Sequence, residues 1–344
     1  MSDIIILGAG SMGTAFSIPC SDKGHKVTIV GTHLENRFID LINSKKIHPI
    51  LNCKIPKNVN FVKFNMLGIV INKNTKLIVI AVISKGIDWA AKELSRVLKF
   101  NNPILILTKG LSLYKNRYEI LAHKMDRVLK KNGIKKTNIT AAGGPCLAKG
   151  LSLRVNTSVV FANKQLKIAK KIATLVKTDY YHIETSKDVT GVEICAAIKN
   201  IFSMVIGASE GLCLKDSSKA IRSKNYLNTA ATLINQSIRE MIIFTTKFGG
   251  KKDTVLGLAG IGDLYVSADG GRNSKMGYFI GQGMTYAKAK KNKMPKDTIE
   301  GAELIREIGK KVNNDFSRKK LPLMTSMINA VLKNKPLTIK WDNF

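Results

Sequence analysis

Short runs of aliphatic residues recur along the first half of the chain and alternate with stretches of helical periodicity, such as Trp89 to Leu98. Runs of this length, rich in Ile and Val, are typical of strands that a sheet buries on both faces. The predicted strands are Ile4 to Leu7, Val27 to Val30, Leu77 to Val82, Ile104 to Leu107, Ile139 to Ala142 and Ser158 to Phe161. Strands and helices in alternation predict an α/β domain with a doubly wound parallel sheet.

The pattern changes after Thr185, where strand signals fade and long segments with a helical apolar period take over. The helices predicted there are Asp188 to Ser209, Lys224 to Phe248 and Pro322 to Leu332. The polar stretch Thr185 to Asp188 separates the two patterns, and Asp188 is suited to cap the next helix. We therefore predict a sheet domain over residues 1–187 and a mostly α-helical second domain over residues 188–344.

Composition fits a folded protein of this size and adds a strong positive charge. The 344 residues are 44% hydrophobic, and 56 Lys and Arg against 24 Asp and Glu give a net charge of +32. Such a potential attracts polyanions, but the basic residues are spread along the whole chain without an RNA-binding aromatic motif. We interpret them as solvated side chains and expect no specific nucleic-acid partner; weak nonspecific adhesion to nucleic acid would be a side effect of the charge.

The cysteines predict neither a disulfide framework nor a metal site. The five of them are odd in number, widely spaced and without a Cys-x-x-Cys pair: Cys20, Cys53, Cys146, Cys195 and Cys213. A reducing cytoplasm fits this usage best. No signal peptide is visible, and Lys199 and Asn200 interrupt the long apolar stretch from Ile194 to Leu214, so no membrane insertion is expected.

A glycine-rich turn follows the first predicted strand. Gly8, Gly10 and Gly13 flank Ser11 and Met12 in the pattern Gly-x-Gly-x-x-Gly. These glycines permit a tight turn and close backbone approach to a pyrophosphate, which binds at the helix N-terminus. We predict a Rossmann-like dinucleotide site here, against the alternative of a merely structural turn. Pro19 is expected to kink or shorten the helix that follows.

The end of the second strand bears on which dinucleotide binds. A carboxylate there would accept hydrogen bonds from the ribose 2′-hydroxyl and repel a 2′-phosphate. The chain has Gly31, Thr32 and His33 at this point, with Arg37 nearby. This favours NADP, or use of both NADP and NAD. The alternative is that Thr32 simply ends the strand and Glu35 binds the ribose.

Lys199 and Asn200 lie on an apolar, small-residue helical segment beginning at Gly191. An ammonium on such a face is costly to desolvate unless an anion or a proton-transfer role compensates. Together with the glycine turn, this residue indicates a nicotinamide-dependent dehydrogenase. Lys109 follows a buried strand at its carboxyl end, where ligands of open α/β sheets bind, although a solvated loop lysine is the alternative.

Two further glycine-rich segments carry candidate chemistry. Gly143-Gly144-Pro145 could bring backbone amides against a ligand, or could be an ordinary turn. Residues 257–264 are too glycine-rich for a plain helix and contain Asp263, while Arg272 follows Gly270-Gly271. Arg272 can bind a phosphate or carboxylate bidentately and Asp263 can orient an ammonium. A loop salt bridge is the alternative for this pair.

The ordered set of these segments resembles the soluble NAD(P)-dependent glycerol-3-phosphate dehydrogenase family, from Ile4 to about Leu332. The matching segments are the glycine turn, Thr108-Lys109-Gly110, Gly144-Pro145, Gly191-Val192-Glu193 with Lys199-Asn200, Gly257 to Asp263 with Gly271-Arg272-Asn273, and Ile299-Glu300-Gly301. The resemblance implies interconversion of dihydroxyacetone phosphate and sn-glycerol 3-phosphate with NADP or NAD, feeding glycerophospholipid metabolism. It also implies a homodimer.

The resemblance implies a role for each matching residue. Lys199 becomes the general acid/base and Asp263 orients it, while Lys109, Asn200 and Ser267 lie at the substrate. Arg272 and Asn273 bind the substrate phosphate and cofactor, and Glu300 contacts the nicotinamide-side ribose. The full cofactor-binding set is Gly8, Gly10, Ser11, Met12, Gly13, Thr32, His33, Lys109, Ala148, Arg272 and Glu300.

Two rival functions remain. A β-hydroxyacid dehydrogenase shares the Gly-x-Gly-x-Met-Gly turn and a helical lysine, but tends to place an asparagine four residues after that lysine, where this chain has Ser203. Asn200 and Arg272 favour a phosphorylated substrate instead. A noncatalytic redox sensor that binds nucleic acid through the +32 charge is the more remote rival.

Overall fold

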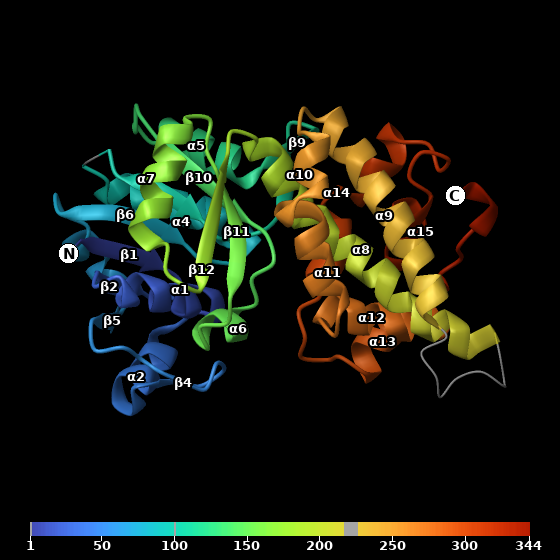
Figure 1. The fold of residues 1–344 in the computed structure, drawn as a ribbon, viewed down its shortest axis with the longest axis horizontal. Coiled ribbons are helices and arrows are strands. Elements are labelled where there is room, and N and C mark those ends of the chain that lie inside the picture. Colours follow the sequence, from blue (N-terminus) through green and yellow to red (C-terminus); the bar gives the residue numbers. More distant parts are fainter. Residues whose placement is uncertain (1, 100, 217–225) are drawn as a thin grey trace. The chain divides into compact units, whose positions relative to one another are not determined.

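The computed structural model of the chain describes residues 2–99, 101–216 and 226–344 (Figure 1). Two compact units can be distinguished. The first consists of Met1–Lys109 and Ile120–Glu193, and the second of Gly110–Glu119 and Ile194–Phe344. The predicted domain boundary between residues 187 and 188 stays a prediction. The start of the predicted helix Lys224 to Phe248 lies outside the described residues.

The first unit is built on an eight-stranded sheet, as far as the described residues go, with the order β12-β11-β10-β7-β6-β1-β2-β5. Every pairing is parallel except β10 with β11. The strands are β1 (Asp3–Leu7), β2 (Lys26–Val30), β5 (Val59–Val62), β6 (Thr75–Ile80), β7 (Pro103–Ile106), β10 (Asn138–Gly143), β11 (Thr157–Ala162) and β12 (Tyr181–Ser186). The predicted α/β fold with a doubly wound, mainly parallel sheet is confirmed.

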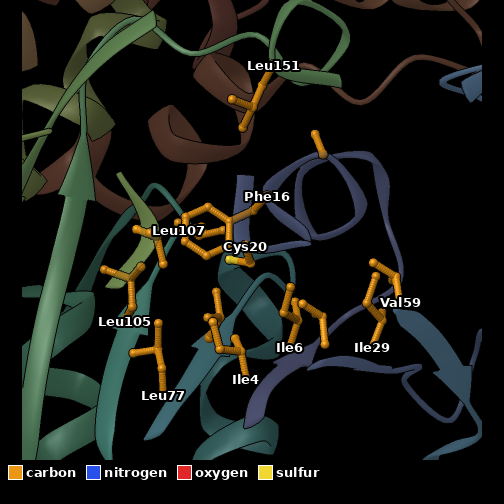
Figure 2. Close-up of a cluster of buried hydrophobic side chains, with 14 of the residues drawn as sticks. Ile4, Ile6, Phe16, Cys20, Ile29, Val59, Leu77, Leu105, Leu107 and Leu151 are labelled. Atoms are coloured by element: carbon orange, nitrogen blue, oxygen red, sulfur yellow. The ribbon is translucent and has the colours of Figure 1, made fainter. Parts of the chain in front are cut away.

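Helices cover both faces of this sheet. Successive residues of β1 point to opposite faces, and Ile4, Ile5 and Ile6 are all at most 2% exposed. Figure 2 shows Ile4 and Ile6 on the face that Phe16 of α1 covers. The helices of this unit are α1 (Ser11–Asp22), α2 (Asn36–Lys45), α3 (Leu67–Val70), α4 (Ile87–Val97), α5 (Leu121–Lys131), α6 (Ala148–Ser152) and α7 (Leu166–Val176). A short hairpin of β3 (Ile47–His48) and β4 (Cys53–Lys54) follows α2.

Pro19 does not shorten α1. The helix continues for three residues beyond it, to Asp22, and Lys23 N–H donates to the Pro19 carbonyl. The predicted shortening is therefore wrong, and the alternative of a kink stays a prediction. Proline removes one backbone donor, but so close to the C-terminus of a buried helix the packing of α1 on the sheet outweighs the loss of one hydrogen bond.

Among its described residues, the second unit has helices and one hairpin of β8 (Leu111–Tyr114) and β9 (Arg117–Ile120), most of which belongs to it. Its helices are most of α8 (Val189–Asp216), α9 (Leu227–Lys247), α10 (Lys252–Leu256), α11 (Asp263–Ala268), α12 (Arg272–Gly281), α13 (Tyr286–Asn292), α14 (Glu300–Asp315) and α15 (Pro322–Leu332). The predicted mostly helical second half is confirmed.

Helix α8 is long and apolar enough to be compared with a membrane span. Residues Val189–Leu214 have a mean hydropathy of 1.6, but 94% of the tested window is buried inside the protein. A core helix passes the same test of length and composition, so this one helix is weak evidence for a membrane segment.

Helix α12 packs on α8 with glycines at the closest points. A Cβ built on Gly277 would lie 1.9 Å from the Met204 carbonyl oxygen, and one on Gly281 would lie 2.3 Å from that of Ala208. A side-chain rotation cannot relieve these clashes, because the atoms that the Cβ would meet belong to the backbone of α8. The glycines therefore set the spacing between the helix that carries Lys199 and the helix that begins at Arg272.

We expect Gly277→Ala to lower the free energy of unfolding by about 3 kcal/mol, because the new methyl group forces two packed helices apart. Urea unfolding followed by circular dichroism measures this. Gly150→Ala is the matched control, since a Cβ there meets only the Val155 Cβ at 3.9 Å. Equal unfolding midpoints for the two variants would contradict the close-packing argument.

Candidate active site

The predicted glycine turn joins β1 to α1. Gly8 has φ +113°, and a Cβ on it would lie 2.7 Å from the Ala81 carbonyl oxygen, so the position requires glycine. A Cβ on Gly13 would lie 2.3 Å from the Gly8 carbonyl oxygen. Gly10 is the N-cap, and Ser11, Met12 and Gly13 form the first turn of α1. The backbone amides of a helix start are thus presented without intervening side-chain bulk, which suits a phosphate.

The end of β2 carries groups of both charges. Glu35 Oε2 accepts hydrogen bonds from the backbone N–H groups of Thr32 at 2.7 Å and Ala9 at 3.2 Å. His33 packs on the Trp89 ring with centroids 5.1 Å apart, and both His33 and Arg37 are exposed. The Glu35 carboxylate, which the sequence analysis gave only as an alternative, therefore lies beside the glycine turn, and the exposed His33 and Arg37 side chains lie nearby in the sequence.

Lys109 and the Gly143-Gly144-Pro145 segment lie together at the carboxyl ends of β7 and β10. The Lys109 ammonium donates a hydrogen bond to the Gly144 carbonyl oxygen at 3.2 Å. Gly144 has φ +118°, which favours glycine. Ala148 begins α6 shortly afterwards. Two motifs that are distant in sequence are thereby joined on the side of the sheet where ligands of such folds bind.

The second unit contains a buried cluster around Lys199. Its ammonium lies 3.0 Å from Asp263 Oδ1, and the two side chains are 9% and 1% exposed. The ammonium also donates to the Ser267 hydroxyl. A buried charge pair is costly unless close contact and further hydrogen bonds compensate for its desolvation, and here the hydrogen bond to Ser267 adds to the 3.0 Å ion pair. Asp263 and Ser267 therefore hold the amine of Lys199 in one orientation.

Residues 258–262 explain how Asp263 reaches this position. They form a π-helical turn directly before α11, whose first residue is Asp263. Such turns are rare and occur mostly at functional sites. The sequence indicated that this segment was no plain helix, but it did not indicate the type of turn.

Asn200 and Asn273 continue the site along α8 and α12. Asn273 Nδ2 donates to Asn200 Oδ1 at 3.0 Å, and Asn273 Oδ1 accepts from Gly301 N–H at 2.9 Å. Arg272 and Glu300 pair at 3.0 Å, and each is about half exposed, at 54% and 51%. The second unit thus brings Lys199 together with Asp263 and Ser267, and Asn200 together with Asn273. The roles of these residues stay predictions.

Three buried titratable residues were given no role by the sequence analysis. His48 is fully buried and bonds to the glycine turn. Glu240 accepts from Leu323 N–H and Met324 N–H at the start of α15. Burial raises the pKa of Glu193 to about 8, although a hydrogen bond from Ala122 N–H opposes this. Within the described residues, no group of three or more His, Cys, Asp and Glu side chains could hold a metal ion.

Two family models match the chain in succession. The model of the NAD-dependent glycerol-3-phosphate dehydrogenase N-terminus matches residues 3–169, and that of its C-terminus matches residues 188–340. A similar curated protein is the NADP(+)-dependent glycerol-3-phosphate dehydrogenase of Archaeoglobus fulgidus, 29% identical over 319 residues, covering 91% of each chain. Another is the glycerol-3-phosphate dehydrogenase [NAD(P)+] of Clostridium botulinum, 28% identical, covering 91% of this chain and 89% of that protein.

Solved structures share the fold. The glycerol-3-phosphate dehydrogenase of Coxiella burnetii superposes with a TM-score of 0.80 at 24% identity, covering 97% of this chain and 96% of the other. That of Plasmodium falciparum gives 0.81 at 19% identity, covering 97% and 92%. Two matching models in the expected order, which together span both units, identify the chain as a member of the NAD-dependent glycerol-3-phosphate dehydrogenase family.

Proposed function

We propose that this chain transfers a hydride reversibly between NAD(P)H and C2 of dihydroxyacetone phosphate, giving sn-glycerol 3-phosphate. Membership of the family supports the reaction. The observation that carries the proposal is the buried Lys199 ammonium, paired with Asp263 and bonded to Ser267. A carbonyl reduction needs a proton donor held in a defined place, and this cluster provides one.

NAD(P)H supplies the hydride when bound, and the residues of the glycine turn fit such a cofactor. Gly8 and Gly13 leave space that side chains would fill, and the first turn of α1 offers backbone donors for a pyrophosphate. Ala148 and Thr32 are proposed cofactor contacts on the family resemblance. Lys109 and Glu300 are proposed contacts on the nicotinamide side.

Lys199 has two tasks in the proposed mechanism. Its ammonium donates a hydrogen bond to the substrate carbonyl oxygen and stabilises the negative charge that develops there. It then delivers the proton that completes the alcohol, and recovers a proton from solvent. Asp263 aims the amine, because its carboxylate lies 3.0 Å from the Lys199 ammonium.

The remaining polar residues are proposed to hold the substrate. Lys109, Asn200 and Asn273 supply donors, and Arg272 binds the phosphate bidentately. Arg272 lies 3.0 Å from Glu300. This exposed ion pair contributes little, so a phosphate dianion can replace the carboxylate at small cost.

Use of both NADH and NADPH is proposed on the charges at the end of β2. Glu35, held there by two backbone donors, suits a ribose hydroxyl and disfavours a 2′-phosphate. His33 and Arg37 favour the phosphate. The curated relatives are named for NADP(+) or for NAD(P)+.

An absorbance assay of NADH and of NADPH oxidation, each with dihydroxyacetone phosphate, tests the function. We expect turnover with both cofactors and no oxidation of 3-hydroxyisobutyrate in the reverse assay. Turnover of 3-hydroxyisobutyrate alone would identify the β-hydroxyacid dehydrogenase rival. Salt-sensitive retention of DNA or RNA with no cofactor oxidation would identify the noncatalytic rival.

A cytoplasmic homodimer is proposed on the same family membership. None of the five cysteines, all of which lie in the described residues, forms a disulfide bond, as in a protein kept reduced. Light scattering at assay concentration is expected to give twice the mass of one chain. A mass equal to one chain would refute the dimer and leave the reaction unaffected.

A further inference from the structure

The backbone of Ala9, between the first two glycines of the turn, is held from both sides by one later segment. Its N–H donates to Glu35 Oε2 at 3.2 Å. Its carbonyl oxygen lies 3.3 Å from Nε2 of His48. Glu35 is the N-cap of α2, and His48 lies in the hairpin that follows α2. The turn that is proposed to bind the pyrophosphate is therefore anchored by residues outside it.

The hydrogen bonds of His48 define its tautomer. Leu51 N–H donates to Nδ1 at 3.1 Å, so Nδ1 is an acceptor and the ring proton lies on Nε2. Nε2–H then donates to the Ala9 carbonyl oxygen. The ring is fully buried and packs edge-on against Phe38 with centroids 5.1 Å apart. Desolvation lowers the pKa of His48, which keeps this neutral donor form.

The geometry of the peptide bond links this contact to the cofactor. In a trans peptide the carbonyl and the following N–H point in opposite directions. A carbonyl of Ala9 that is held toward His48 therefore aims the N–H of Gly10 away from the ring. Gly10 is the N-cap of α1, where the backbone donors of a dinucleotide site lie.

We propose that His48 is a positioning residue for dinucleotide binding, acting through the Ala9–Gly10 peptide to aim a backbone donor at the cofactor pyrophosphate. The inference rests on the proposed function, because it takes the glycine turn as the cofactor site. It adds a residue that lies in the hairpin after α2, and its contact with the turn is to a backbone atom.

A second donor to the same carbonyl does not replace His48. The Thr14 hydroxyl also lies 3.3 Å from the Ala9 oxygen. Thr14 belongs to α1 itself, so its hydrogen bond moves with the turn and cannot fix it against the rest of the unit. His48 and Glu35 are attached to α2 and its hairpin, which makes them external anchors.

Two substitutions distinguish the effects of the two hydrogen bonds that the His48 ring makes. In His48→Asn, the side-chain oxygen can still accept from Leu51 N–H, but no donor reaches Ala9. In His48→Gln, the terminal amide nitrogen can reach Ala9 in place of Nε2. Because His48→Asn loses one hydrogen bond, we expect it to raise the Kd and the KM for NADH about threefold to tenfold. The kcat at saturating NADH is expected to stay unchanged. His48→Gln is expected to restore binding to within about twofold.

Binding is measured by NADH fluorescence on the full chain, with kinetics in parallel and His182→Asn as the control for histidine replacement elsewhere in the first unit. The inference is overturned if His48→Asn and His48→Gln have the same Kd for NADH, either both equal to that of the wild type or both raised. If His48→Asn does not fold, the nitrogen-15 shifts of His48 in the wild type decide: an Nδ1–H tautomer overturns it, and an Nε2–H tautomer supports it. Wild-type protein that binds neither NADH nor NADPH refutes the proposed function instead.

Discussion

Replacing Lys199 with alanine is expected to lower kcat by about 10³-fold or more while the Kd for NADH stays nearly unchanged. The substitution removes both the charge that stabilises the carbonyl oxygen and the proton that completes the alcohol, and general acid catalysis alone typically contributes about 10²- to 10⁴-fold. Cofactor affinity is retained, because the donors of the glycine turn belong to a different part of the chain. Steady-state kinetics and NADH fluorescence titration measure the two effects.

The controls take account of the Asp263 carboxylate, which Lys199→Ala leaves without its partner cation. Asp263 is 1% exposed, and without Lys199 it is a buried charge lacking its cation. Lys199→Met combined with Asp263→Asn removes both charges at similar volume, so it restores folding without restoring the acid. The exposed Lys252→Ala controls for loss of a surface lysine in the same unit. Turnover near the wild-type rate in either Lys199 variant would remove this residue from the mechanism.

Glu240→Ala is expected to lower the free energy of unfolding by about 3 kcal/mol. Glu240 is fully buried on α9, and its two oxygens accept from Leu323 N–H at 2.8 Å and Met324 N–H at 2.9 Å. Alanine leaves two buried donors at the start of α15 unsatisfied and opens a cavity, and each orphaned donor costs about 1–3 kcal/mol. Urea unfolding monitored by circular dichroism measures the loss.

A pH series with Glu240→Gln tests the same group without deleting its volume. Burial raises the pKa of Glu240 to about 7, although hydrogen bonds from Met324, Leu323 and Gln236 oppose this. Between the ordinary glutamate pKa of 4.5 and about 7, the folded state keeps a proton that the unfolded state has released, so stability falls as pH rises through this window. Glutamine does not titrate, and the variant should show a smaller decline. Glu193 titrates in both proteins, so its contribution cancels when the two pH dependences are compared. If the free energy of unfolding of the wild type and of Glu240→Gln falls equally with pH, Glu240 is not the group that titrates.

The strands predicted from sequence were those in the middle of the sheet. Their aliphatic runs reflect burial on both faces, which a single sequence displays directly. The strands β5 and β12 were missed because they lie at the two edges, where polar residues alternate with apolar ones: Val59-Asn60-Phe61-Val62 and Tyr181-His182-Ile183-Glu184. The hairpin of β8 and β9 was missed because its strands are short and pair only with each other.

The candidate site divides in a similar way. Lys199 could be singled out from the residues alone, because an ammonium on an apolar helical face requires an explanation. Its connection to Asp263 and Ser267 came from family resemblance, since a π-helical turn sets their positions and no sequence period indicates such a turn. His48 could not be found, because its function depends on a carbonyl thirty-nine positions earlier in the chain.

The hairpin of residues 110–119 has a consequence for the order in which the chain assembles. It belongs to the second unit, yet it is synthesised with the first, and its Tyr118 ring packs against Phe244, 126 positions later, with centroids 5.6 Å apart. A ribosome-bound chain that ends at residue 193 therefore has a complete sheet and a hairpin whose aromatic partners do not yet exist. If the chain is cut at that residue and the halves are expressed separately, the second half lacks the hairpin of its own unit and the first half carries that hairpin without its partners, so we expect both to aggregate unless they are produced together.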